Sequence, residues 1–174
     1  MKNDHHSTNE KELMDYYNYS GSIGKLRLIV KFLHMWFLHS IAYSTPLPSI
    51  AIWAQRSRNV KIGKGCHFSP YVQIDLLYPQ LVTIDDNVTI GSNVMIFTHV
   101  NPTTNPYLKS HGYPRKVQPV HIKSGAIIAP GSIITAGVTI GANSIVGVGS
   151  VVSQDVPDNC VVLGNPARII KKIE

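Results

Sequence analysis

Aliphatic residues recur at every sixth position over most of the chain. The step is unbroken through six positions from residue 120 onward, and two shorter series keep the same step earlier. The positions are Ile62, Phe68 and Ile74; Ile84, Ile90 and Ile96; and Ile122, Ile128, Ile134, Ile140, Val146 and Val152. A repeat of this kind stacks equivalent side chains in one interior, so these residues are the predicted core. Each would contribute about 1.5–3 kcal/mol on full burial.

Three positions after each core residue, the chain usually has a residue that tolerates positive φ. Most of them are glycine or asparagine, which indicates a tight turn after every sixth residue. They are Gly65, Tyr71, Asn87, Asn93, His99, Gly125, Gly131, Gly137, Asn143, Gly149 and Asp155. Short β-branched stretches between regular turns predict an all-β solenoid, a parallel β-helix of hexapeptide repeats with three flat sides and about 18 residues per coil. A β-sandwich is the alternative, but it would not keep a six-residue step through six positions.

Two interruptions break this register. Ile84 follows Ile74 by ten positions instead of six, so residues 76–79 are expected to bulge at a corner. The second interruption is a proline-rich insertion over residues 100–119. A long loop in a compact repeat domain is usually functional, although a tolerated surface insertion is the alternative.

The part of the chain before the repeats has a different pattern. Residues 1–22 are mainly polar and are expected to be flexible, whereas apolar residues recur at helical spacing over residues 23–43. We expect a helical segment and linker over residues 23–58 that covers the open end of a β-helix spanning residues 59–167. A basic amphipathic helix that lies on a membrane surface is the alternative. Residues 168–174 would form a basic tail.

Composition narrows the function. With 44% hydrophobic and 15% charged residues the chain is expected to fold, and its net charge of +6 favours anionic partners. No aromatic and basic nucleic-acid motif is present, so a phosphorylated small molecule is a better match than nucleic acid. The polar N-terminus does not resemble a signal peptide, and we expect a cytoplasmic protein. Cys66 and Cys160 form neither a disulfide framework nor a metal-type pair.

The last coils resemble the hexapeptide-repeat acyltransferases. The resemblance rests on the segment from Ile140 to Val152, on Asp155-Val156-Pro157, and on the ending Gly164-Asn165-Pro166-Ala167-Arg168-Ile169-Ile170. It covers about residues 60–174 and is nearest to maltose, galactoside and nodulation O-acetyltransferases and to related O-antigen and capsule enzymes. The resemblance implies a left-handed β-helix, a homotrimer with active sites between subunits, acetyl-CoA as co-substrate, and a hydroxyl of a sugar or polysaccharide precursor as acceptor.

His99 is the candidate catalytic residue. It follows Phe97-Thr98 immediately before the long loop, where the similar enzymes carry their catalytic histidine. Imidazole is suited to take a proton from an attacking hydroxyl near neutral pH. A turn histidine without a chemical role is the alternative. The similar enzymes often have proline after this histidine, whereas this chain has Val100, a difference that concerns the acceptor more than the base.

The same resemblance suggests residues that bind the acceptor. Asp75 would contact acceptor hydroxyls, and an aspartate that only caps a turn is the alternative. His67 matches a position where the sugar enzymes often have asparagine. Tyr113 and Arg115 in the inserted loop are weaker candidates for the same role.

Coenzyme-binding residues are also implied by the resemblance. A groove between neighbouring solenoids would be lined by small residues, and cations near the C-terminus would pair with the phosphates. The candidates are Ala129, Val148 and Ser153 for the groove, and Arg168, Lys171 and Lys172 for the phosphates. A solvated C-terminal end is the alternative. Gln154 follows Ser153 where the similar enzymes often have lysine, so one expected cationic contact is missing.

Three other functions are weighed against O-acetylation. A zinc site like that of the γ-class carbonic anhydrases needs two histidines five positions apart, but Thr104 and Ala126 occupy those positions after His99 and His121. No metal is therefore expected. A non-catalytic scaffold would need neither acetyl-CoA nor a loop beside a histidine. Among enzymes, N-acetylation of an amino-sugar nucleotide is the runner-up, because an amine acceptor needs much the same base.

Overall fold

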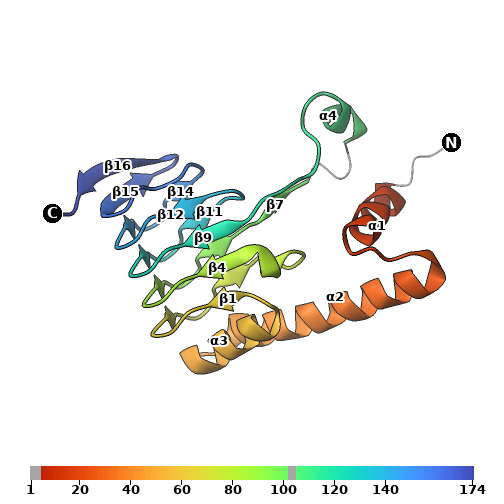
Figure 1. Cartoon of the computed structure of the whole chain (residues 1–174), viewed down its shortest axis with the longest axis horizontal. Helices are drawn as coiled ribbons and strands as arrows, with labels where there is room; N and C mark the ends of the chain where they lie inside the picture. The colour runs from red at the N-terminus through yellow and green to blue at the C-terminus, as the bar shows by residue number, and fades with distance from the viewer. Residues whose placement is uncertain (1–4, 102–104) are drawn as a thin grey trace.

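The computed structural model describes residues 5–101 and 105–174. Figure 1 shows a β-helix whose coils stack from β1 to β16, with a long helical segment at its N-terminal end and a short helix on the arm that projects from its second coil. The helices are α1 (His5–Tyr16), α2 (Gly21–Ser44), α3 (Pro48–Ser57), the short α4 (Pro106–Ser110) and the 3₁₀ helix η1 (Pro79–Leu81).

Three sheets form the sides of the β-helix, and we name them A, B and C; their strands are parallel except for the last strand of side B. Side A contains β1 (Lys61–Ile62), β4 (Val82–Ile84), β9 (Val120–Ile122) and β12 (Thr139–Ile140). Side B contains β2 (His67–Phe68), β5 (Thr89–Ile90), β10 (Ile127–Ile128), β13 (Ile145–Val146), β15 (Cys160–Gly164) and β16 (Ala167–Lys172). Side C contains β3 (Gln73–Ile74), β6 (Met95–Ile96), β11 (Ile133–Ile134) and β14 (Val151–Val152). Successive strands visit sides A, B and C in turn, and the left-handed parallel β-helix is confirmed.

The predicted core is also confirmed. Eleven of the twelve positions in the six-residue series are at most 2% exposed; only Ile62, in the terminal coil, is half-buried. Equivalent positions stack in register, as where Ile128 pairs with Val146 and Ile134 pairs with Val152, 18 residues further along. One six-residue step therefore corresponds to one side, and three steps complete a coil.

Positive φ occurs at nine of the eleven predicted turn positions. Tyr71 is a notable case, because its φ of 67° is rare for a bulky side chain. His99 differs from the regular turns, since it is the first residue of strand β7 (His99–Val100), which pairs antiparallel with β8 (Lys116–Val117). The chain therefore leaves the coil at His99 and returns through β8.

The helical segment covers the first coil. Helix α3 packs against β1 and β2, and its Ala51 joins the core of the β-helix. Helix α2 extends beyond the solenoid toward α1 (Figure 1). Among the described residues no helix is long and apolar enough to cross a bilayer.

The N-terminal segment differs from the flexible chain expected over residues 1–22. Residues 5–16 form α1, whose Leu13 and Met14 are buried against Leu28 and Tyr78. The polar composition of this segment was misleading because a few apolar side chains are enough to hold a short helix in place. The C-terminal residues also differ from a simple tail, because β16 pairs antiparallel with β15 at the end of side B.

Candidate active site

Both interruptions of the repeat lie at the same corner, where side C leads to side A. Strand β3 is followed by the bulge and strand β6 by the long loop, and the two strands pair with Ile74 beside Ile96. Asp75 and His99 therefore leave neighbouring coils at this corner. Extra residues in two successive coils therefore replace the regular turn at this corner.

The Asp75 carboxylate holds the His99 imidazole in place. Oδ2 of Asp75 lies 2.6 Å from Nδ1 of His99 and accepts a hydrogen bond of 2.9 Å from the backbone N–H of Thr98. Oδ1 accepts hydrogen bonds from the backbone N–H groups of Leu77 (2.9 Å) and Tyr78 (3.1 Å). Burial alone raises the pKa of Asp75, but the hydrogen bonds from His99, Thr98 and Tyr78 outweigh it and lower the pKa to about 2. Asp75 is thus ionised at neutral pH.

An ionised Asp75 determines the tautomer of His99. The carboxylate only accepts hydrogen bonds, so Nδ1 of His99 carries the proton and donates it to Asp75. In the neutral imidazole the lone pair is then on Nε2. The side chain of His99 is 22% exposed and that of Asp75 is 0% exposed. Asp75 therefore orients the histidine. The expected contact of Asp75 with acceptor hydroxyls stays a prediction.

Arg58 supports Asp75 from the capping helix. Its Nη2 donates hydrogen bonds to the backbone carbonyls of Asp75 (2.6 Å) and Ile74 (3.2 Å), and its Nη1 donates to Oε1 of Gln55 (2.6 Å). Arg58 and Gln55 are both 0% exposed. Burial lowers the pKa of Arg58 to about 10, against the opposing attraction of Asp75, so the guanidinium stays charged at neutral pH. Arg58 was not among the residues expected from the sequence, because it lies before the repeats and no motif marks it.

Tyr78 connects the histidine to the inserted loop. Its ring lies edge-on to the His99 imidazole with centroids 5.3 Å apart, and its hydroxyl accepts a hydrogen bond of 2.6 Å from Arg115. Arg115 also donates to Asn9 (2.7 Å) and lies 3.3 Å from Glu12, both on α1. Tyr78 was part of the predicted bulge, but its contact with His99 depends on how that bulge folds.

Helix α1 also contacts the inserted loop through a second basic residue, Lys109. Glu12 accepts a hydrogen bond of 2.6 Å from Lys109 on α4 in addition to its ion pair with Arg115. Asn9 accepts another hydrogen bond of 3.1 Å from Asn101, two residues after His99. The N-terminal helix therefore braces both ends of the described loop beside the histidine.

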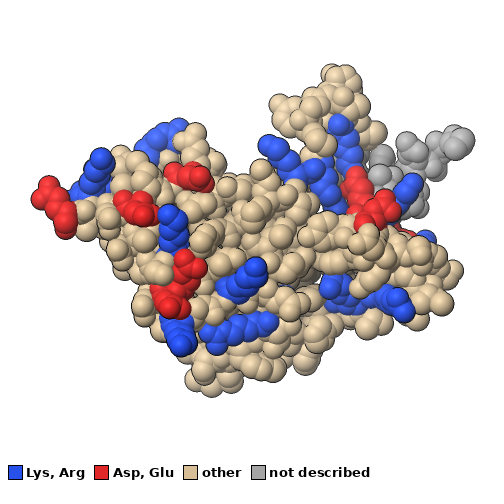
Figure 2. Space-filling view, in the orientation of Figure 1, with Lys and Arg blue, Asp and Glu red and all other residues tan. Residues whose placement is uncertain are grey.

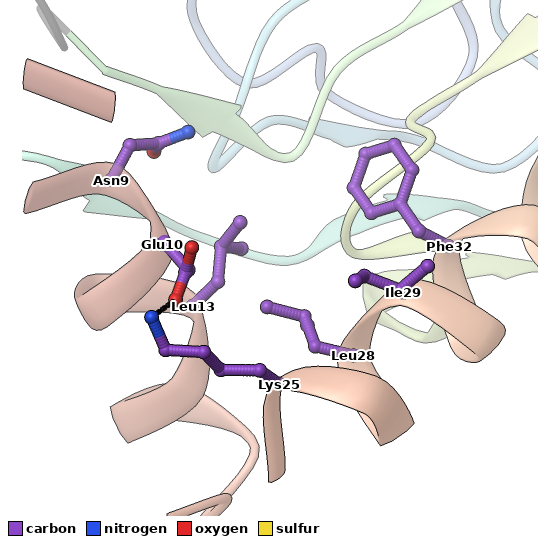
Figure 3. Close-up of a pocket in the computed structure, with 7 residues that line it drawn as sticks. All are labelled: Asn9, Glu10, Leu13, Lys25, Leu28, Ile29 and Phe32. Carbon is purple, nitrogen blue, oxygen red and sulfur yellow. Dashed lines mark ion pairs between the residues drawn. The ribbon is translucent and has the colours of Figure 1, made fainter. Parts of the chain in front are cut away.

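A pocket of about 350 Å³ lies between α1 and α2 next to this brace. Figure 3 shows its apolar wall, formed by Leu13, Leu28, Ile29 and Phe32, and the ion pair between Lys25 and Glu10 along one side. Asn9, which binds Arg115 and Asn101, lines the same pocket. The pocket is thus connected to the histidine site through residues of the loop.

The other residues expected to bind the acceptor lie in different parts of the chain. Arg115 is near the histidine through Tyr78, whereas Tyr113 is 66% exposed on the segment between α4 and β8. His67 is exposed on β2 of side B, which is opposite the corner between sides C and A. Within one chain His67 is therefore not brought to His99.

The coenzyme candidates lie in later coils. Ser153 is exposed directly after β14, at the same corner as His99 and two coils further on. Ala129 and Val148 lie where side B leads to side C, in neighbouring coils, and Val148 is 68% exposed. The C-terminal cations are exposed on β16, namely Arg168, Lys171 and Lys172. One chain therefore spreads these six residues over two edges and one end of the solenoid.

A second pair of aspartate and histidine lies on side A. His121 Nε2 is 3.0 Å from Asp85 Oδ2, but both side chains are more than a third exposed, so water competes for this contact. Among the side chains that the structure describes, no group of three metal-type ligands occurs. The corner arrangement favours acid–base chemistry by a half-buried imidazole that a buried carboxylate orients.

Comparisons with known proteins agree with this fold. No family model matches the chain. A Bacillus subtilis protein named "Putative acetyltransferase YvoF" is 32% identical over 131 residues, which cover 75% of this chain and 71% of that protein. The structure of a maltose O-acetyltransferase from Clostridium difficile 630 has a TM-score of 0.66 and 29% identity, covering 84% of this chain and 88% of that one.

Two further structures share the fold. A galactoside acetyltransferase in complex with coenzyme A has a TM-score of 0.62 and 25% identity, covering 84% of this chain and 82% of that one. A hexapeptide-repeat acetyltransferase from Vibrio cholerae has a TM-score of 0.67 and 23% identity, covering 85% and 93%. From the repeat, the structural likeness and the Bacillus subtilis relative together, we conclude that this chain belongs to the hexapeptide-repeat acetyltransferases.

Proposed function

We propose that this protein transfers an acetyl group from acetyl-CoA to a hydroxyl of a sugar or polysaccharide precursor, with His99 as the general base. The observation that carries the proposal is the contact of 2.6 Å between Nδ1 of His99 and the buried, ionised carboxylate of Asp75. This contact leaves the Nε2 lone pair for a substrate proton at a corner opened by an insertion.

The reaction follows from this arrangement. The acceptor hydroxyl attacks the thioester carbonyl while Nε2 of His99 takes its proton, which forms a tetrahedral intermediate and an imidazolium. The ionised Asp75 stabilises that imidazolium through Nδ1, as the carboxylate does in a serine–histidine–aspartate triad. When the intermediate collapses, the carbon–sulfur bond breaks and the imidazolium returns the proton to the coenzyme A thiolate. The products are the acetyl ester and free coenzyme A.

Acetyl-CoA as the donor is supported by the related structures. The galactoside acetyltransferase was solved with coenzyme A, and a Vibrio cholerae neighbour of the same fold was solved with acetyl-CoA. In the present chain Ala129, Val148 and Ser153 would line the pantetheine groove. The exposed cations Arg168, Lys171 and Lys172 would meet the phosphates.

We further propose that the working unit is a homotrimer. His99 lies in the second coil, whereas the proposed coenzyme residues lie in later coils, and His67 is on the opposite side of the solenoid. Packing three solenoids side by side would bring a corner of one chain against a side of the next. A complete site would then lie between subunits, and an isolated monomer would be inactive.

The decisive experiment measures thiol release from acetyl-CoA over a panel of sugars, sugar nucleotides and amino sugars. We expect turnover with at least one hydroxyl acceptor, and a loss of about 10²-fold or more in the His99→Ala variant. His121→Ala is the matched control, because His121 also pairs with an aspartate but at an exposed position. Turnover restricted to amines would replace O-acetylation with N-acetylation, and unchanged activity in His99→Ala would remove the histidine from the mechanism.

A further inference from the structure

Helix α2 has apolar residues on all sides. Its inner face packs on the rest of the protein through Gly24, Leu28, Met35, Leu38 and Ala42. The opposite face, which we call the outer face of α2, carries seven large apolar side chains that are 56–70% exposed. They are Ile23, Leu26, Ile29, Val30, Leu33, Trp36 and Phe37. Such a contiguous apolar surface marks an interaction site, because a helix in water normally presents polar residues on its outer side.

The sequence segment that contains this helix carries positive charges and no negative ones. No aspartate or glutamate occurs from residue 16 to residue 74, whereas seven lysines and arginines do. The remaining nine basic and ten acidic residues of the chain nearly cancel, so this region accounts for the net charge of +6. Figure 2 shows blue side chains along α2, while the red side chains of this part of the molecule gather at α1. The partner of the outer face should therefore be anionic as well as apolar.

A groove on the flank of α2 combines both properties. It has a volume of about 510 Å³ and an apolar floor formed by Tyr19, Ile23, Leu26 and Val30. Cationic and ionisable side chains line it as well, namely Arg27, Lys31 and His34. An apolar floor beside a cationic edge suits a phospholipid, because its acyl chains would contact the floor and its phosphate would meet the cations.

We propose that α2 docks this protein on an anionic phospholipid bilayer, with the helix lying in the plane of the interface. Its 24 residues would place a helix of roughly 36 Å along the surface. Trp36 would lie at the headgroup level, where tryptophan is enriched. A second copy of the chain is the competing occupant, but α2 and α3 carry no carboxylate to pair with Arg27 and Lys31 of another copy.

Vesicle flotation tests the docking. Full-length protein is mixed with vesicles of phosphatidylcholine alone or of equal parts phosphatidylcholine and phosphatidylglycerol, without acetyl-CoA or acceptor. We expect flotation with the anionic vesicles only, and weaker binding when the salt concentration approaches ~0.5 M, because salt screens the attraction of Arg27 and Lys31. With Trp53 replaced by phenylalanine, the emission of the remaining Trp36 should shift to shorter wavelength on binding.

Paired variants separate docking from folding. Leu33→Glu with Phe37→Glu should reduce binding to anionic vesicles at least about tenfold, since both side chains lose their place in the interface. Tyr107→Glu with Ile173→Glu adds the same charge at exposed apolar residues away from α2 and should bind like the wild type. Thermal unfolding of all variants checks that the fold is intact.

Three results would overturn the proposal. One is wild-type protein that stays unbound with both kinds of vesicle, and another is a Leu33 and Phe37 double variant that floats like the wild type. The third is a change of sedimentation coefficient in that double variant without vesicles, which would assign the outer face of α2 to a contact between copies. None of these outcomes depends on acetyl transfer, so the docking and the proposed activity fail separately.

Discussion

His99 Nδ1 lies 2.6 Å from Asp75 Oδ2, although 24 positions separate the two residues in the sequence. Pairing of β3 with β6 sets this distance, because it stacks the residues that follow the two strands. Three backbone N–H groups, from Leu77, Tyr78 and Thr98, hold the carboxylate as well. The orientation of the imidazole is thus fixed by the backbone of the bulge and the coil.

Asp75→Asn should lower kcat by roughly 10²-fold or more, because an amide stabilises the imidazolium poorly and permits the wrong tautomer of His99. Binding of acetyl-CoA, measured by calorimetry, should change little. Asp85→Asn is the control, since Asp85 pairs with His121 at an exposed site, and its activity should stay near that of the wild type. Equal effects of the two substitutions would contradict a specific role of Asp75.

Glu12→Gln should loosen the inserted loop, because Glu12 contacts both Lys109 and Arg115. We expect the KM for the acceptor to rise several-fold with a smaller change in kcat, since the substitution leaves the pair of Asp75 and His99 in place. Steady-state kinetics with a saturating acetyl donor measures the KM for the acceptor and kcat separately. Glu10→Gln, which removes an ion pair between α1 and α2 instead, should leave the KM for the acceptor nearly unchanged.

His39 should make the folded state sensitive to mild acid. Burial and, to a smaller extent, the charge of Arg58 lower the pKa of His39 to about 4, from an ordinary value of 6.5. Between these values the unfolded chain takes up a proton that the folded protein does not, so stability is full above about pH 6.5 and falls toward pH 4. The unfolding temperature should therefore drop over this range.

His39→Gln should reduce that drop, whereas His34→Gln, at an exposed position of the same helix, should keep it. The Asp75 carboxyl contributes at lower pH, because its pKa of about 2 in the folded state lies below the ordinary value. Its contribution is present above about pH 4 and is lost as the pH falls toward 2. A flat unfolding temperature between pH 6.5 and pH 4 in the wild type would contradict the lowered pKa of the half-buried His39.

Ile134→Ala should cost about 2–5 kcal/mol in the free energy of unfolding, because Ile134 is 0% exposed and its removal leaves a cavity between stacked coils. Denaturant unfolding monitored by circular dichroism measures this loss. Ile127→Ala, at a position 41% exposed on the outside of side B, should cost markedly less. Similar losses for the two variants would contradict the inward direction of the six-residue series.

Sequence alone predicted the solenoid, because each hexapeptide carries its own core residue and its own turn residue. Ile128 and Asn143 need no distant partner to be recognised, since the same pattern repeats in every coil. His99 and Asp75 were also candidates from the sequence, but through the resemblance to known enzymes. Their contact could not be predicted, because it depends on how two coils align. Insertions of different length interrupt the six-residue step in both coils.

Tertiary structure decided everything that depends on non-repeating segments. Residues 5–16 look polar, yet they form a helix that packs beside the loop through Asn9, Glu12 and Leu13. Arg58 lies 17 positions from Asp75, and only the docking of α3 on the first coil brings its guanidinium to the Asp75 carbonyl. The physical reason is that turns and core positions are set by local sequence and repeat along the chain. Buried polar contacts depend instead on which distant segments pack together.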